Sequence, residues 1–227
     1  MRKQQSGFTL IEIAIVLVII GLLLGGVLKG QELITAARVR NLISSQDGVK
    51  AAYFGFLDRY RALPGDYGPA ATAQANIPGC GACLGGNSNG QIAGADEPQI
   101  AWEHLSKAGF ITGSYTYPAT AAASNTNTPA NPYGSLVQLI FDNVYREGNN
   151  GGADTGTNRH NLKTGGNIPS DIMAEVDRKV DDGLAGTGQM RQSTFGSAGT
   201  YATCATAATG AWQSATPVAD CGGSLLF

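Results

Sequence analysis

The chain has 227 residues, enough for one medium-sized domain with an accessory element. Its 15 Lys and Arg residues against 17 Asp and Glu residues give a net charge of -2, so no global basic field favours nucleic acid as a partner. Only 14% of the residues are charged and 32 are glycine, a composition that fits a loop-rich extracellular fold better than a cytosolic enzyme.

The first predicted element is an apolar helix that follows a short basic leader. Residues 1–7 are polar and basic, and Phe8–Leu28 is then apolar apart from one threonine, one glutamate and several glycines. At ~1.5 Å per residue this run spans about 30 Å, the thickness of a hydrocarbon core. The positive-inside rule places the leader in the cytoplasm, so everything after Lys29 is expected to lie across the membrane.

Two other interpretations of this segment are a cleaved secretory signal and a plain signal anchor. A secretory signal carries small residues in an A-x-A arrangement after its apolar region, and Gly25-Gly26-Val27-Leu28 is a poor version of that site. Hydropathy alone leaves the plain anchor open. Glu12 separates the interpretations, because a carboxylate at the centre of a bilayer costs roughly 2.5–3.5 kcal/mol and therefore needs a function.

The string Ser6-Gly7-Phe8-Thr9-Leu10-Ile11-Glu12 resembles the type III signal of type IV pilins and type II secretion pseudopilins. This resemblance implies that a prepilin peptidase cuts between Gly7 and Phe8 on the cytoplasmic side and methylates Phe8. Glu12 is then the fifth mature residue. Its carboxylate is expected to face the Phe8 amine of a neighbouring subunit and to set the register of assembly, because a misplaced subunit leaves a charge unpaired. The alternative is a glutamate that snorkels to the headgroups.

The helical pattern continues beyond the apolar run but becomes amphipathic. Between Val39 and Tyr60 the apolar residues recur three or four positions apart, and charged residues occupy the other faces. Pro64-Gly65-Asp66 then ends the helix. We therefore expect residues 8–28 to be the transmembrane and filament-core half of one long helix, and residues 29–62 to be an amphipathic half.

The head, residues 63–227, shows a mixed pattern of short helices and strands. Glu97–Ala108 and Ser170–Val180 predict helices, the second with Ser170 as its N-cap. Leu136–Tyr145 and Gln189–Phe195 predict strands. The remaining long segments are predicted to be loops or connectors: 65–95, 118–134 and 149–166. The fold class is therefore α+β, and the resemblance implies a long N-terminal helix packed against a head with a small antiparallel sheet.

Four cysteines fall on the expected non-cytoplasmic side, where disulfides persist: Cys80, Cys83, Cys204 and Cys221. Four cysteines allow three connectivities. The resemblance favours a Cys204–Cys221 disulfide, since many pilins close a C-terminal surface loop in this way, and it leaves Cys80–Cys83 to close the glycine-rich loop. The alternatives are a zinc site and a redox Cys-x-x-Cys, although the sequence offers neither a second Cys-x-x-Cys nor a thioredoxin-like context.

Two further patterns resemble catalytic sites. Gly86–Gly90 matches the G-x-S-x-G string of hydrolases, but the predicted elements place neither a strand before nor a helix after Ser88. His104 is predicted to pack on its helix beside Trp102, and His160 is predicted to lie in a loop. Two histidines alone form no convincing base or metal set, and we predict no catalytic residue.

Oxygen-rich segments make calcium the alternative to our prediction of no cofactor and no metal. Calcium prefers hard oxygen ligands, yet the spacing here is not that of an EF-hand, and a solvated turn and a helix C-terminus explain the same residues. The residues concerned are Asn149, Asn150, Asp154 and Asn158 in one group, and Asp177, Asp181 and Asp182 in the other.

The resemblance implies a structural filament subunit rather than an enzyme. We expect it to cross the inner membrane once with a cytoplasmic N-terminus, and to be processed by prepilin peptidase. It would then pass through an inner-membrane assembly platform into a homo-oligomeric helical filament, periplasmic or extracellular. A pseudopilin of a type II secretion system is the alternative that shares the same signal. From a different class, the alternative is a membrane-tethered periplasmic hydrolase or metalloprotein. No nucleic-acid partner is predicted.

Overall fold

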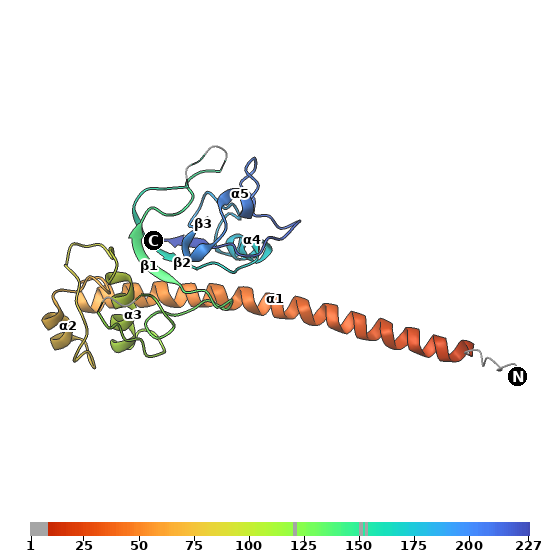
Figure 1. Ribbon diagram of the computed structural model, residues 1–227, viewed down its shortest axis with the longest axis horizontal. Coiled ribbons are helices and arrows are strands. Elements are labelled where there is room, and N and C mark those ends of the chain that lie inside the picture. Colours follow the sequence, from red (N-terminus) through yellow and green to blue (C-terminus); the bar gives the residue numbers. More distant parts are fainter. Residues whose placement is uncertain (1–8, 120–121, 150–151, 153) are drawn as a thin grey trace, which may run out of the picture. The chain divides into compact units, whose positions relative to one another are not determined.

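The computed structural model describes residues 9–119, 122–149, 152 and 154–227 (Figure 1). The chain divides into two compact units after Arg38, and each is described separately. The first helix, α1 (Leu10–Tyr60), begins in the first unit and ends in the second.

The first unit presents an apolar helical surface that no other described segment covers. α1 contains an 18-residue window with a mean hydropathy of 2.8, long and apolar enough to cross a membrane, and none of that window is buried. Side-chain exposure in this part reaches 89% at Leu10 and is still 46% at Ile20. Because exposed apolar area of this extent is unfavourable in water, this part of α1 requires lipid or protein neighbours.

The second unit is built on a four-stranded antiparallel sheet. Its strands lie in the order β1-β2-β4-β3, so the last strand of the chain is an inner strand. The bounds are β1 Gln138–Asp142, β2 Arg159–Lys163, β3 Met190–Gln192 and β4 Gly223–Leu226. The long N-terminal helix and this sheet confirm the predicted α+β, pilin-like fold class.

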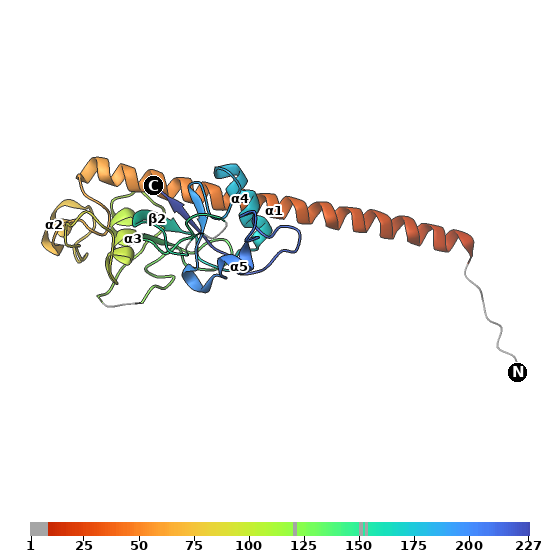
Figure 2. The same cartoon turned by 90° about the horizontal axis from the view of Figure 1, so that it is seen from above.

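Short helices surround the sheet: α2 Ala70–Asn76, α3 Glu97–Lys107, α4 Ser170–Val180, the 3-10 turn η1 Phe195–Ser197, and α5 Tyr201–Cys204. α2 lies beside the C-terminal end of α1 in both views (Figures 1 and 2). The helices at Glu97–Lys107 and Ser170–Val180 match the predicted ones to within a residue at each end, and Met190–Gln192 lies inside the predicted Gln189–Phe195 strand. β1 is shorter than the predicted strand Leu136–Tyr145.

The core of the second unit joins α1 to the sheet and to α3. Apart from Ala52, the residues of α1 that are buried there lie three, four or seven positions apart, on one face of the helix: Val39, Leu42, Gln46, Ala52, Tyr53 and Phe56. All of them except Gln46 share one apolar cluster with Trp102 and Leu105 of α3 and with Leu139 and Leu162 of the sheet. Ring centroids of Tyr53 and the C-terminal Phe227 are 4.9 Å apart, so the chain end closes this core. The predicted amphipathic stripe is thus a packing surface.

Two segments predicted to be loops contain regular structure. α2 lies within residues 65–95, and β2 lies within residues 149–166, so His160 is on a strand and not in a loop. β2 has no apolar alternation because it is an inner strand whose polar side chains bond to their neighbours. Asn161 donates from Nδ2 to Asp142 (3.0 Å) and accepts a bond from the Ser224 hydroxyl (2.9 Å).

The predicted N-cap role of Ser170 is wrong. Pro169 is the N-cap residue and Ser170 is the first residue of α4. The Ser170 hydroxyl instead donates to the Gln213 carbonyl (2.5 Å) and accepts the Val218 N–H (2.9 Å). The Ser170 hydroxyl is therefore hydrogen-bonded to a segment distant in sequence, and not to the helix end as the local sequence pattern predicts.

A buried lysine holds the polar side of the sheet together. Lys163 is 1% exposed, and its Nζ lies 2.9 Å from Asp142 Oδ1 and donates to the Val144 carbonyl at 2.8 Å. Burial lowers the pKa of Lys163, and the Asp142 carboxylate opposes that shift. The charge is acceptable in the core because it is both paired and hydrogen-bonded.

Replacing Asp142 with alanine should therefore lower the free energy of unfolding by about 3–5 kcal/mol, because Lys163 keeps its buried charge without a partner. Urea unfolding of the purified chain, followed by the fluorescence of the buried Trp102 and Trp212, measures this change. Asp58→Ala is the control, since its contact with Arg61 is 3.8 Å long and both side chains are more than 80% exposed. Equal effects of the two variants would contradict this account of the lysine.

Candidate functional site

The N-terminal site begins where the described residues begin. Gly7 and Phe8, the predicted processing residues, lie outside the described residues, and the predicted assembly residue Glu12 is in the first turn of α1. Thr9 donates to Glu12 Oε2 from both its backbone N–H and its hydroxyl, each at 2.8 Å. In return, the Glu12 N–H donates to Thr9 Oγ1 at 3.4 Å. This reciprocal pair is a capping box, which satisfies backbone N–H groups that a helix start leaves without partners.

Thr9 is the residue of this site that the sequence analysis did not single out. The signal was present, because a threonine followed three positions later by a glutamate, just before an apolar run, is the pattern of a capping box. The consequence is that the Glu12 carboxylate is hydrogen-bonded within its own subunit before it meets any other chain. Thr9 therefore lowers the cost of carrying this carboxylate on an apolar helix.

The charge of Glu12 nevertheless lacks an ion-pair partner in the part of the chain that the structure describes. Among the described residues, no basic side chain forms an ion pair with Glu12; the other acidic residue of the first unit, Glu32, pairs with Lys29 at 2.7 Å. The surrounding side chains, Leu10, Ile11 and Ile13, are apolar and exposed. A cation supplied from outside these residues would complete the site electrostatically.

The four cysteines form two disulfides, Cys80–Cys83 and Cys204–Cys221, the pairing that the resemblance favours. All four are at most 1% exposed. A sulfur in a disulfide is not a thiolate, so the zinc alternative has no cysteine ligands in this structure. Closing the 17-residue separation of Cys204–Cys221 stabilises the head by about 3 kcal/mol in the chain-entropy model.

Helix α4 holds the loop that the Cys204–Cys221 disulfide closes. At the N-terminal end of α4, Ser170 bonds to Gln213 and Val218 as described above. Near its C-terminal end, the Trp212 indole N–H donates to Asp177 Oδ2 at 2.5 Å. On either side of Trp212 and Gln213 the loop exposes small and hydroxyl-bearing residues: Thr206, Ala207, Ala208, Thr209, Ser214, Ala215 and Thr216.

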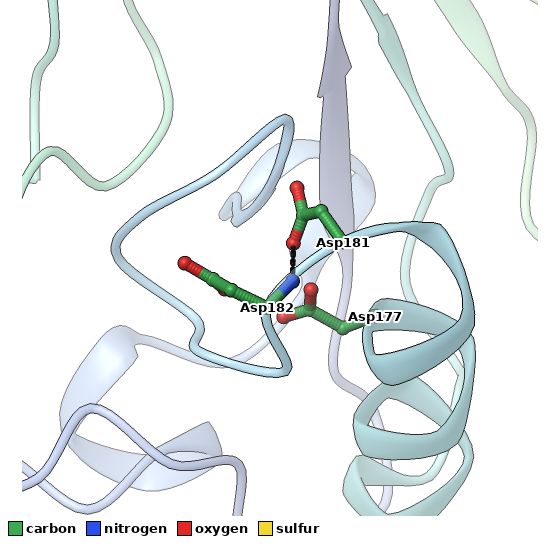
Figure 3. Close-up of side chains that lie close together, drawn as sticks. All are labelled: Asp177, Asp181 and Asp182. Carbon is green, nitrogen blue, oxygen red and sulfur yellow. Dashed lines mark hydrogen bonds between the residues drawn. The ribbon is translucent and has the colours of Figure 1, made fainter.

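Three carboxylates gather at the C-terminal end of α4 (Figure 3). One oxygen from each of Asp177, Asp181 and Asp182 lies within 4.8 Å of the others, the one such acidic group found among the described residues. Asp177 has no exposed surface and also accepts the Gly183 N–H at 3.2 Å. Asp181 accepts the backbone N–H groups of Asp182, Gln189 and Met190.

Asp177 and Asp181 are neighbouring carboxyl groups whose pKa values are shifted in opposite directions. Burial, followed by the hydrogen bond to Asp181, raises the pKa of Asp177 to about 8. Burial also acts to raise the pKa of Asp181, but the hydrogen bonds from Asp177 and from the backbone N–H groups outweigh it and lower that pKa. Asp177 is therefore the group of this pair that keeps its proton to higher pH, and Asp181 is the one that ionises first.

Asp154, the carboxylate of the other oxygen-rich segment, is not a member of this cluster. Asp154 pairs with Arg146 at 2.8 Å, and the Arg146 guanidinium also lies over the Tyr201 ring, 4.0 Å from its centroid. Asn150 lies outside the described residues, and Asn158 is exposed. The Asn149 side-chain oxygen is buried without a hydrogen-bond partner among the described atoms.

His104 has a structural role. It is fully buried, its Nδ1 accepts the Gly65 N–H at 3.1 Å, and its Nε2 lies 2.8 Å from the Leu84 carbonyl. Burial lowers the pKa of His104 to about 4, so the ring stays neutral and both nitrogens remain committed to the backbone. These bonds fix the loop that follows α1 to the loop that follows Cys83, which accords with the predicted packing role.

The comparison with known families agrees with the N-terminal site. Residues 2–28 match the model of the prokaryotic N-terminal methylation motif, the signal carried by type IV pilins and pseudopilins. The resemblance noted from the sequence is therefore confirmed for this segment. No curated protein and no solved structure gives a significant match to the chain.

The carboxyl pair predicts a pH dependence for the stability of the head. The pKa of Asp177 is raised above its ordinary value of 3.8 to about 8, so between these values the folded protein holds a proton that the unfolded chain has released. The free energy of unfolding should therefore fall as the pH rises from about 4 to about 8. The lowered pKa of Asp181 acts only below this window.

Asp177→Asn should flatten this slope, because the amide has the size of a protonated carboxyl group and keeps an acceptor for Trp212 but does not titrate. Urea midpoints measured from pH 5 to pH 9 test the prediction. Glu175→Gln, on the same helix but in an exposed pair with Lys179, is the control and should keep the wild-type slope. An unchanged slope in Asp177→Asn would show that other groups carry the pH dependence.

Proposed function

We propose that this chain is the structural subunit of a type IV pilus or a pilus-like filament. The observation that carries the proposal is the N-terminal methylation motif at residues 2–28, on a helix whose apolar surface is exposed. A signal of this kind implies a substrate of prepilin peptidase and a structural rather than a catalytic role. The processing step we propose is a cut between Gly7 and Phe8, followed by N-methylation of Phe8.

Membrane insertion precedes assembly in this proposal. Phe8–Leu28 anchors the precursor in the inner membrane, with the basic leader in the cytoplasm and the head on the other side. Two features support this orientation: basic residues precede the apolar run, and the four cysteines are paired in disulfides, as is usual outside the cytoplasm.

Assembly replaces lipid by protein around the apolar helix. An inner-membrane platform would pass subunits into a helical homo-oligomer in which the Phe8 amine of one subunit faces the Glu12 carboxylate of a neighbour. The pair would make register specific, because a shifted subunit leaves one charge unpaired in an apolar environment. Thr9 would hold the carboxylate in place until that partner arrives.

A pseudopilin of a type II secretion system carries the same signal and is the second candidate. The exposed disulfide-closed loop between Cys204 and Cys221 favours the pilus, since a loop of this kind suits display on a filament surface. The products of neighbouring genes would distinguish the two roles: a retraction ATPase fits a pilus, and secretion components fit a pseudopilus.

Glu12→Gln tests the charge pair, because glutamine can still complete the capping box with Thr9 but carries no charge. The variant should be inserted and cleaved, yet the amount of sheared filament should fall at least about tenfold, since one buried amine per subunit loses its partner. Glu32→Gln is the control and should assemble normally, because its pair with Lys29 is more than 60% exposed on both sides. Wild-type filament yield from Glu12→Gln would exclude this role for the charge.

Gly7→Leu tests the processing step independently of assembly. A bulky residue before the scissile bond should block the peptidase, so the precursor accumulates in the membrane at its full length. An immunoblot that resolves the seven-residue difference between precursor and product reads this out. Normal cleavage of Gly7→Leu would place the processing site elsewhere.

A further inference from the structure

A cavity of about 690 Å³ opens in the second unit, where the C-terminal end of α1 meets the segment that leads into α2. Its size falls within the range of small-molecule sites, about 300–1,000 Å³. The residues that matter for its chemistry come from three distant parts of the sequence: Tyr60, Arg61, Asp66, Tyr67, Ser88 and His160. The cavity thus brings together Ser88 of the G-x-S-x-G string and one of the two histidines, neither of which the proposed filament role uses.

The wall formed by residues 86–93 is held rigidly by two buried carboxylates. Asp66 accepts the N–H groups of Asn89 (3.1 Å) and Gly90 (2.8 Å), and Glu97 accepts those of Asn87 (3.2 Å) and Ala93 (2.9 Å). Asp66 is 3% and Glu97 is 7% exposed. Burying two carboxylates to fix one exposed loop is costly unless the loop has to keep its shape.

Gly86 packs directly against the backbone of Gly65 and Asp66. A Cβ at Gly86 would lie 2.4 Å from the Asp66 Cα and from the Gly65 carbonyl oxygen, so only glycine allows the contact. Residues 86–93 and the Gly65–Asp66 backbone that they contact are therefore held in place before any ligand binds. This reduces the entropy lost on binding.

Two residues at the cavity have a left-handed backbone that is unusual for residues other than glycine. Arg61 has a φ of 55° and Ser88 a φ of 57°. Residues held in such conformations concentrate at binding sites, where the surrounding structure compensates for the strain. At Arg61 this conformation ends α1 and leaves the guanidinium exposed, with only a 3.8 Å contact to the exposed Asp58.

The bonding of Ser88 and His160 argues for binding rather than catalysis. Ser88 Oγ accepts the Gly68 N–H at 3.0 Å and lies 3.5 Å from the Asp66 carbonyl oxygen. His160 Nε2 accepts the Ile92 N–H at 3.3 Å, so its proton is on Nδ1. Among the described residues no hydrogen bond joins the serine to the histidine, and the serine has no base to activate it.

The lining is electrically balanced and amphipathic. Arg61 contributes one positive charge and Asp66 one negative charge, and burial lowers the pKa of His160, which keeps the ring neutral at physiological pH. Tyr60 and Tyr67, whose ring centroids are 5.6 Å apart, supply aromatic surface. A ligand that matches has an apolar face for the rings, several hydroxyl groups for the polar side chains, and no net charge.

We propose that this cavity, defined by Tyr60, Arg61, Tyr67, Ser88 and His160, binds a neutral saccharide of one or two rings. The C–H face of a sugar ring packs on the tyrosines, and its hydroxyl groups bond to the Arg61 guanidinium and the His160 Nδ1–H. This inference goes beyond the filament role and does not depend on it, since every residue involved lies in the second unit.

The test uses the purified full-length chain in lauryldimethylamine oxide, a detergent without a sugar head group. A printed array of neutral and acidic mono- to tetrasaccharides identifies the ligands, and calorimetric titration measures the affinity of the best neutral one. Arg61→Gly should weaken binding about 10- to 100-fold, because it removes a charged hydrogen-bond donor. Glycine accepts a positive φ without strain, so the variant should unfold at the wild-type temperature or above it.

Asn167→Gly is the matched control. Asn167 also has a left-handed backbone, with a φ of 63°, but it is exposed and does not line the cavity. It should bind the saccharide with wild-type affinity. The proposal is overturned if no neutral saccharide binds at millimolar concentration, if only acidic saccharides bind, or if Arg61→Gly binds as tightly as the wild type.

Discussion

The carboxylate of Glu12 is the constraint on which the account of the N-terminal unit depends. It lies on a helical surface that is otherwise apolar and exposed, and among the described residues its hydrogen bonds come from Thr9. Those bonds engage one of its two oxygens, Oε2, but leave its charge without an opposite charge among the described residues. A neighbouring amine, created when the leader is removed, would supply that charge, so processing and assembly become linked through one ion pair.

Specific polar contacts add to the stability that the apolar core gives the second unit. Lys163 with Asp142, and Asp177 with Trp212, each connect segments that are distant in sequence. Together with the two disulfides they hold long glycine-rich loops in defined positions. Since such loops bury little apolar area, cross-links of this kind give a loop-rich head its definite structure.

Local patterns in the sequence predict the elements whose formation depends on residues close together in the chain. The apolar run, the amphipathic continuation to Tyr60 and the helices at Glu97–Lys107 and Ser170–Val180 follow from periodicity and turn residues. β2 was missed because its central side chains are polar and bond across the sheet. The local pattern predicts Ser170 as an N-cap. It does not reveal the bond to Gln213, which joins positions 43 residues apart. The cavity beside α1 was invisible for the same reason, since Arg61, Ser88 and His160 meet only in the folded chain.

The most direct test of the central claim is the intact mass of the mature protein and of its N-terminal peptide. The account predicts a chain that begins at Phe8, lacks the seven leader residues and carries one added methyl group on its amine. A mature product that still begins at Met1, or one that begins beyond Leu28, would contradict it. Glu12 would then have no processed amine to meet.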